Sequence, residues 1–301
     1  MGAAEAAKIV PVGWRWLGLA CGVIAAFCFS MGTLLSPTVY SAGGSAAAIV
    51  VIRLSLILPV FFGFAVVTRR PLALPPRQRY LAFALGILTA FQTLVIFTSF
   101  RYIPISLAIL IEYTYPLLVL IAMRILFGEG LTVARVVAMV VALAGLALAL
   151  GVDPSMAHPL GVALAALSAV WVATRLIASS RFLRTADVIR LLIHMQVAGL
   201  AVALPLFGLL GLLQFPQTLE GVAALGGMAA FNGVGVFLAL KALTLIGPVR
   251  TSMAQAMESV FTVSLAGLLL GESLSPQKIL GAAMVIGAVA TVQFLRNRPA
   301  R

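Results

Sequence analysis

The chain has 301 residues, of which 62% are hydrophobic and only 9% are charged, and its formal net charge is +12. In a soluble domain about 25% of the residues are charged, so this composition excludes a soluble fold and makes a lipid bilayer the solvent of most side chains. The positive charge does not indicate nucleic-acid binding, because the basic residues lie in short loops between apolar runs and not on one polar face.

Ten apolar runs follow one another along the chain, and each has about the 20 residues that a membrane-spanning helix needs. They cover residues 14–35, 44–67, 80–101, 104–127, 131–151, 159–180, 187–212, 219–245, 248–270 and 275–295. The first run is longer than a cleaved signal peptide and nine more follow it, so we expect it to remain in the protein. The sequence therefore predicts an all-α integral membrane protein with ten transmembrane helices.

The loops between these runs alternate in charge. Arginines lie between the second and third runs, between the sixth and seventh, and after the fourth and the tenth (Arg69, Arg70, Arg77, Arg79, Arg181, Arg184, Arg135, Arg296, Arg298 and Arg301), with Arg175 and Arg190 near helix ends. The loops at 36–43, 152–158 and 213–218 contain no Lys or Arg. Because cytoplasmic loops are enriched in Lys and Arg, we expect both termini in the cytoplasm.

One segment of the chain occurs twice. Residues 102–132 enter an apolar helix through Pro104, carry Glu112 deep inside it and end at Gly128-Glu129-Gly130-Leu131. Residues 245–275 repeat this layout with Pro248, Glu258 and Gly271-Glu272-Ser273-Leu274. Other pairs extend the repeat: Leu17-Gly18 to Ser36 resembles Leu160-Gly161 to Ser179 in pattern, LPVFFGF at 58–64 resembles LPLFGLL at 204–210, and Phe91-Gln92 resembles Phe231-Asn232.

The repeat divides the chain into two five-helix halves, residues 1–151 and 152–301. Five is odd, so the second half enters the membrane from the opposite side. Inverted repeats with a site near the bilayer midplane are typical of secondary transporters. Gene duplication within a purely structural helix bundle is the alternative interpretation.

The repeated segments, FRYIPISLAILIEYTYPLLVLIAMRILFGEGLT and LKALTLIGPVRTSMAQAMESVFTVSLAGLLLGESLS, resemble the two signature segments of EamA-type transporters of the drug/metabolite transporter superfamily. The closest resemblance is to YddG-type amino-acid exporters. It implies a 5+5 inverted-repeat bundle in a bacterial inner membrane. Many members have a proline in the middle of each signature helix. Pro116 fits this pattern, whereas the second half has Ser259-Val260 there.

Several kinds of chemistry are absent from the sequence. It has no P-loop, so ATP does not drive the chain by itself. His158 and His194 have no Cys or acidic neighbours at ligand spacing, so we expect no metal and no cofactor. No Ser-His-Asp arrangement is present, and we predict that the chain is not an enzyme. Cys21 and Cys28 lie about 10 Å apart along one helix, too far for a disulfide.

Three charged residues lie deep in apolar runs. Glu112 is about 12 Å past Pro104, Glu258 is about 15 Å past Pro248, and Arg53 is near the centre of the second run. Each such charge costs about 2.5–3.5 kcal/mol to insert, so it faces a cavity or another charge. The functional interpretation is a site for a zwitterion, and the alternative is a structural pair of Arg53 with one glutamate. We expect Glu129 and Glu272 to help end or pair helices.

Small polar and aromatic residues near the same depth complete the candidate substrate site. The full candidate set is Ser30, Arg53, Gln92, Glu112, Tyr113, Trp171, Thr174, His194, Asn232, Gln255, Glu258 and Ser259, with Tyr115 beside them. Each could instead make an interhelical hydrogen bond. Gly18-x3-Gly22 and Gly267-x3-Gly271 are interpreted as intramolecular packing sites rather than dimer contacts.

These observations favour a secondary transporter that exports amino acids, including aromatic or other hydrophobic ones, and related small metabolites by alternating access. Its partners are a small-molecule substrate and the lipid bilayer, and the chain acts as a monomer or weak dimer. An exporter of drugs or quaternary ammonium compounds is the alternative carrier, and it would favour an aromatic cage around one carboxylate. A permeability channel is a further alternative.

Overall fold

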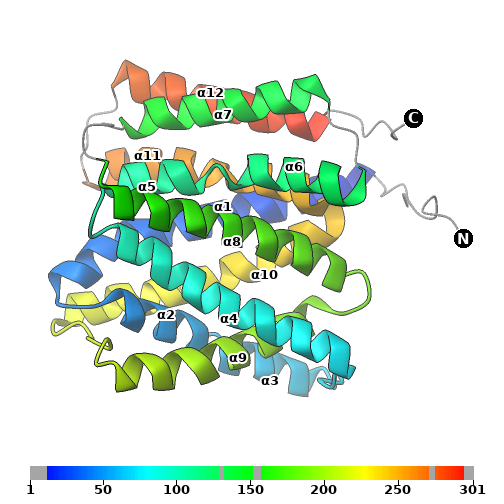
Figure 1. Cartoon of the computed structure of the whole chain (residues 1–301), viewed down its shortest axis with the longest axis vertical. Helices are drawn as coiled ribbons and strands as arrows, with labels where there is room; N and C mark the ends of the chain where they lie inside the picture. Colours follow the sequence, from blue (N-terminus) through cyan, green and yellow to red (C-terminus); the bar gives the residue numbers. More distant parts are fainter. Residues whose placement is uncertain (1–11, 129–131, 152–156, 271–274, 295–301) are drawn as a thin grey trace, which may run out of the picture.

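The structure is a computed structural model that describes residues 12–128, 132–151, 157–270 and 275–294 (Figure 1). Within these ranges all regular secondary structure is helical. The helices are α1 (Val12–Ser41), α2 (Ala46–Ser55), α3 (Leu58–Val67), α4 (Pro76–Ser99), α5 (Ile105–Glu112), α6 (Tyr115–Phe127), α7 (Val133–Leu150), α8 (Pro159–Phe182), α9 (Val188–Leu209), α10 (Leu219–Gln255), α11 (Met257–Leu270) and α12 (Pro276–Phe294). The predicted all-α fold is confirmed for the described residues.

Each of the ten predicted apolar runs contains helix in the structure. The second run is divided into α2 and α3, and the fourth into α5 and α6. The eighth run and the start of the ninth form α10, and α11 completes the ninth. Eight stretches of the described chain are long and apolar enough to cross a membrane. The multi-pass organisation expected from hydropathy is therefore present.

The two signature segments both form broken helices. Pro104 occupies the N-cap of α5, and Pro116 lies in the first turn of α6, where its missing N–H is not needed. Pro116 also has no N–H to donate to the carbonyl four residues earlier, that of Glu112, and the chain leaves the helix at Tyr113 and Thr114. The second break, at Ala256 between α10 and α11, occurs without a proline.

The predicted boundary at residues 245–248 is a kink inside α10. Gly247 has φ 77° and ψ 173°, which are not helical values. Glycine adopts a positive φ without steric penalty, and Pro248 follows as the first residue of a new helical segment. The chain turns back at this point (Figure 1), so α10 contributes two helices that run in different directions.

Helices from the two halves interleave. Helix α1 packs along α10, α8 packs along α4, and α7 pairs with α12. Two close approaches occur at related positions: a Cβ at Gly18 would lie 2.7 Å from Ile246 Cγ2, and a Cβ at Gly161 would lie 2.7 Å from Ile103 Cγ2. Small residues of this kind allow membrane helices to approach closely.

Two sets of loops meet at the ends of the bundle. At one end, Arg70 forms an ion pair with Asp187, and Gln78 Nε2 donates to Thr185 Oγ1 over 3.2 Å. These contacts join the basic loop 68–75 and the first turn of α4 to the basic loop 183–187. At the other end, loops without Lys or Arg are joined, because Ser45 N donates to Gln214 O over 2.9 Å and Gln217 N to Ala42 O over 2.8 Å.

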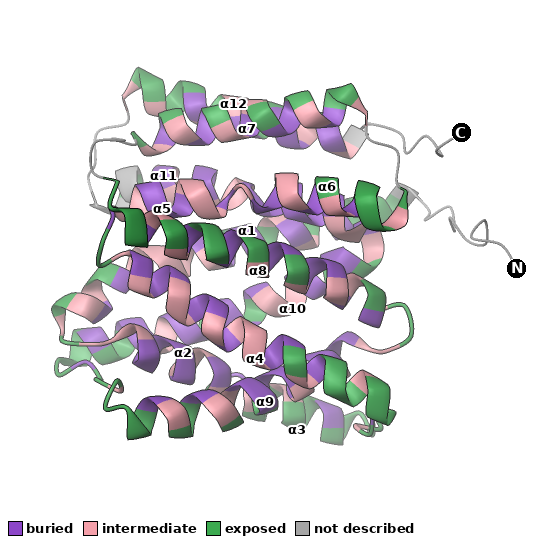
Figure 2. Ribbon diagram, in the orientation of Figure 1, coloured by how far each residue is buried: buried purple, intermediate pink, exposed green. Residues whose placement is uncertain are grey.

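The outer surface of the bundle is apolar. Figure 2 shows exposed residues along the outward faces of the helices and buried residues between them. Large hydrophobic side chains are among the most exposed, including Leu209 at 88% and Val67 at 83%. Monomeric soluble proteins rarely expose large contiguous apolar patches, whereas lipid tails cover such a surface. The exposed face therefore fits a bilayer environment.

Several sequence predictions concern residues outside the described ranges. These are the roles of Glu129 and Glu272, the arginines at 296, 298 and 301, the glycine pair that includes Gly271, and most of the loop at 152–158.

Candidate functional site: a charged cavity between the halves

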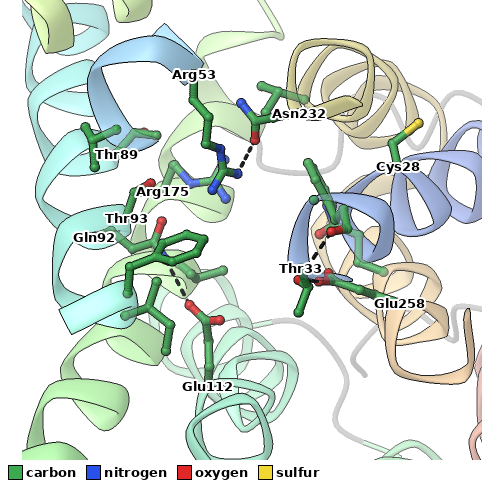
Figure 3. Close-up of a pocket in the computed structure, with 18 of the residues that line it drawn as sticks. Cys28, Thr33, Arg53, Thr89, Gln92, Thr93, Glu112, Arg175, Asn232 and Glu258 are labelled. Carbon is green, nitrogen blue, oxygen red and sulfur yellow. Dashed lines mark hydrogen bonds between the residues drawn. The ribbon is translucent and has the colours of Figure 1, made fainter. Parts of the chain in front are cut away.

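A cavity of about 160 Å³ lies at the centre of the bundle. Residues of α1, α2, α4, α5, α6, α8, α9, α10 and α11 line it, together with Phe100 after α4 and Tyr113 in the break between α5 and α6 (Figure 3). Seven of the predicted site residues are among them: Arg53, Gln92, Glu112, Tyr113, Asn232, Gln255 and Glu258. The cavity thus gathers the three deep charges that the sequence singled out.

Glu112 is held by hydrogen bonds from two other helices. Its Oε1 accepts from Gln92 Nε2 over 2.8 Å and from Ser168 Oγ over 2.5 Å. Glu112 is the last residue of α5, where the carbonyl ends of the helix disfavour a negative charge. The donors from α4 and α8 therefore supply the stabilisation that its own helix does not.

Glu258 lies in a different electrostatic setting. It occupies the first turn of α11, where the helix dipole favours a negative charge. Its Oε2 accepts from the Tyr113 hydroxyl over 2.5 Å, and its Oε1 accepts from Thr33 Oγ1 over 3.3 Å. Tyr113 lies in the α5–α6 break, so this hydrogen bond connects the two broken helices.

Two arginines line the cavity, Arg53 from α2 and Arg175 from α8. Arg53 Nη2 donates to Asn232 Oδ1, and its guanidinium lies 5.7 Å from the centre of the Phe97 ring. Within the described ranges, neither arginine has a carboxylate oxygen within 4.0 Å. The alternative of a structural pair between Arg53 and a glutamate is therefore not found. The cavity holds two positive and two negative side chains without direct ion pairs.

The sequence profile of the EamA-like transporter family matches the chain twice, at residues 16–151 and 159–294. The chain belongs to the EamA-like transporter family. It is accordingly a multi-pass membrane protein and a transporter of small molecules. The two matches of this EamA-like protein fall on either side of residues 152–158, and both contribute charged residues to the cavity.

One solved structure, titled "Crystal structure of protein", resembles this EamA-like protein with a TM-score of 0.79 and 20% sequence identity. The match covers 93% of this chain and 99% of that chain. At such an identity the likeness supports the fold alone. A comparison with curated proteins gives no match.

Five predicted site residues of the EamA-like protein do not line the cavity: Ser30, Trp171, Thr174, His194 and Ser259. Ser30 Oγ accepts a hydrogen bond from Thr262 Oγ1 over 3.1 Å, which is the interhelical alternative. Thr174 is exposed and donates to Val170 O of its own helix. Ser259 Oγ likewise donates to Ala256 O. The sequence did not predict which side of its helix each of these residues occupies.

His194 and Trp171 also lie away from the cavity. His194 Nδ1 is 2.8 Å from Arg190 O, and its ring centre is 5.9 Å from that of Phe83. Trp171 is partly exposed. Both positions belong to helix surfaces that pack outside the cavity, so the structure gives neither residue a contact with its interior.

Other residues contact the cavity or its carboxylates although the sequence did not single them out as site residues. They are Thr33, Thr89, Thr93, Ser168, Arg175 and Gln196. Arg175 was interpreted as a helix-end residue, but α8 continues to Phe182, about 10 Å further along the axis. Ser168, Val172 and Arg175 are spaced i, i+4 and i+7, which places them on one face of a helix. This spacing is the signal that could have identified Arg175.

Proposed function

We propose that this protein is a secondary transporter that exports amino acids and related small zwitterionic metabolites by alternating access. The observation that carries the proposal is the cavity with two carboxylates and two guanidiniums that do not pair directly with one another. Charges inside a membrane are costly unless they have partners or water. A substrate with one ammonium group and one carboxylate supplies partners of both signs and leaves the net charge of the cavity unchanged.

The size of the cavity favours a small substrate. An apolar cavity of about 150 Å³ accommodates benzene, so about 160 Å³ suits a metabolite and not a bulky dye. Phe29, Phe97 and Phe100 line part of the wall, which provides an apolar surface for an aromatic or aliphatic side chain. An exporter of quaternary ammonium compounds is the second candidate, and the two arginines in the same cavity disfavour it.

The proposed architecture is two inverted repeats of five transmembrane helices, residues 1–151 and 152–301. The reciprocal packing of α1 on α10 and of α8 on α4 supports it, because an inverted pseudo-twofold axis would relate these two contacts. The described chain begins and ends on the same side of the bundle (Figure 1), as an even number of crossings requires. The joined basic loops lie at this end, so the positive-inside rule assigns both termini to the cytoplasm.

A bacterial inner membrane is the proposed location, on the basis of the family resemblance. We propose that the chain acts as a monomer or weak dimer. We propose no enzymatic activity and no metal or organic cofactor. Within the described ranges no cluster of three or more His, Cys, Asp and Glu side chains could hold a metal ion.

Transport by the purified protein in liposomes tests this proposal. We expect saturable uptake of one or more radiolabelled amino acids and acceleration of that uptake by unlabelled amino acid inside the liposomes. Labelled tetraphenylphosphonium provides the cationic comparison. Saturable transport of the cation alone would support the drug exporter, and flux that stays linear in amino-acid concentration without trans-stimulation would support a channel.

A further inference from the structure

The two arginines of the cavity are arranged differently from its two glutamates. Each glutamate accepts hydrogen bonds from two described side chains. Arg53 donates to a single side chain, Asn232. Arg175 Nε is buried and has no hydrogen-bond partner among the described residues. A guanidinium has five N–H donors, so most of the donors of this pair remain available to a ligand.

The two guanidiniums are also near one another. Both side chains line the cavity and enter the same part of it in the view of Figure 3. Like charges repel, and the repulsion is stronger in a protein interior than in water. Desolvating each charge adds a further penalty. A pair of this kind without a carboxylate between its members is the arrangement expected of an anion-binding site.

We propose that Arg53 and Arg175 together form the binding site for the carboxylate of the substrate, with each guanidinium donating to it. This inference rests on the proposed function and adds Arg175 as a specificity-determining residue. The planar fork of arginine matches the geometry of a carboxylate. A carboxylate also fits the charge of the site better than a doubly charged phosphate group, because a zwitterion keeps the positive and negative charges of the filled cavity equal.

The position of Glu258 gives the substrate an orientation. Figure 3 shows Glu258 across the cavity from the two arginines. The ammonium group therefore points towards α11, and the carboxylate lies between α2 and α8. Arg53 belongs to the first family match and Arg175 to the second, so the bound carboxylate connects the two halves of the transporter.

Discrimination between an amino acid and its amide tests this site. Calorimetry on the purified wild-type protein first identifies the amino acid that binds most tightly, and the amide of that amino acid is then the matched probe, since it lacks only the negative charge. We expect the wild type to prefer the amino acid by about 30-fold or more, the range for a buried charge that loses its partner. In Arg175→Gln, the affinity for the amino acid should fall, so that the amino acid binds at most about threefold more tightly than its amide. The affinity for the amide should stay within about threefold of wild type.

Two further variants separate binding from folding. Arg181→Gln makes the same change on α8 at an exposed position and should keep the wild-type preference. Arg175→Lys keeps the positive charge but loses the planar guanidinium, and should give a preference between those of the wild type and Arg175→Gln. If Arg175→Gln does not fold, Arg175→Lys replaces it in the test. The melting temperature of Arg175→Gln should not fall, because the change relieves a repulsion and removes no ion pair. Equal losses of amino acid and amide, or an unchanged preference, would overturn the inference.

The failure of the proposed function would look different. If no amino acid binds to the wild type, that proposal fails, and propionate then tests the arginine pair alone. Binding of propionate to the wild type and its loss in Arg175→Gln would support the anion site. Absence of propionate binding to the wild type would reject it.

Discussion

At the residue scale, the two carboxylates of the cavity have opposite local environments. Glu112 ends a helix and Glu258 begins one, so the backbone disfavours a charge at the first position and favours it at the second. The sequence identified both glutamates from their depth alone. It could not identify their partners, because Ser168 and Thr33 come from helices that are 56 and 225 residues away in the chain.

Replacing Glu258 with glutamine separates charge from shape. In Glu258→Gln the amide oxygen can still accept from the Tyr113 hydroxyl, and the amide NH2 can donate to Thr33 Oγ1, which can itself donate to Phe29 O instead. We therefore expect the protein to fold and its melting temperature to stay within a few degrees of wild type. The affinity for a zwitterion should fall about 30-fold or more, because the ammonium group loses its counter-charge. Binding and melting are measured on the same sample. Glu220→Gln, at an exposed position in α10, is the matched control; wild-type affinity in Glu258→Gln would refute this role.

Ser168 is expected to stabilise the protein through Glu112. Ser168→Ala removes the donor that lies 2.5 Å from the carboxylate, and a buried acceptor that loses a donor destabilises a fold by about 1–3 kcal/mol. We expect a lower melting temperature in detergent. Ser180→Ala serves as the control, because the Ser180 hydroxyl donates to Ile177 O of its own helix and to no other described residue. Equal melting temperatures in the two variants would show that Glu112 does not depend on Ser168.

At the scale of the helices, the cavity depends on two breaks and on several close crossings. The first break was predictable, since Pro116 interrupts the signature helix. The second break at Ala256 has no local sequence signal, and only its position in the repeat, 140-odd residues after the first, indicates it. Which helix faces would cross was not predictable either, because glycines occur throughout the apolar runs and only some lie at contacts.

The crossing of α4 and α9 provides a test of such a contact. A Cβ at Gly86 would lie 2.1 Å from Met195 O, a backbone atom that cannot move without shifting α9. Gly86→Ala should therefore destabilise the protein by about 1–3 kcal/mol, as other overpacked sites do, and lower its melting temperature. Gly226→Ala in α10 is the control, since nothing lies within 4 Å of its Cβ. A melting temperature for Gly86→Ala at or above that of Gly226→Ala would mean that α4 and α9 cross less closely.

At the scale of the whole molecule, the sequence predicted correspondence between the halves but not how they interleave. The repeat pairs Gly18 with Gly161, yet nothing in the sequence states that each would pack on the signature segment of the related half. The cavity arises from this interleaving, because charges from both family matches converge there. The position of a residue along its helix follows from the sequence. Which side of the helix faces the cavity depends on how the neighbouring helices pack against it.

The orientation in the membrane is the property of the whole molecule that labelling can decide. In a variant without Cys21 and Cys28, single cysteines replace exposed residues at the two ends of the bundle: Ser41 and Gln217 at the end without basic loops, and Arg77 and Arg184 at the basic end. A membrane-impermeant maleimide added to intact cells should label the first pair, because the basic loops remain in the cytoplasm. The second pair should react only after the membrane is permeabilised.

The same four variants also test the inverted repeat. Ser41 follows the first predicted span and Gln217 follows the seventh, an interval of six crossings that keeps them on one side. Arg77 and Arg184 follow the second and sixth spans, an even interval as well. If one of the second to seventh runs did not cross the membrane, Ser41 and Gln217 would lie on opposite sides. Labelling of Ser41→Cys and Gln217→Cys from opposite sides would therefore contradict ten crossings, even though each half could still contain five helices.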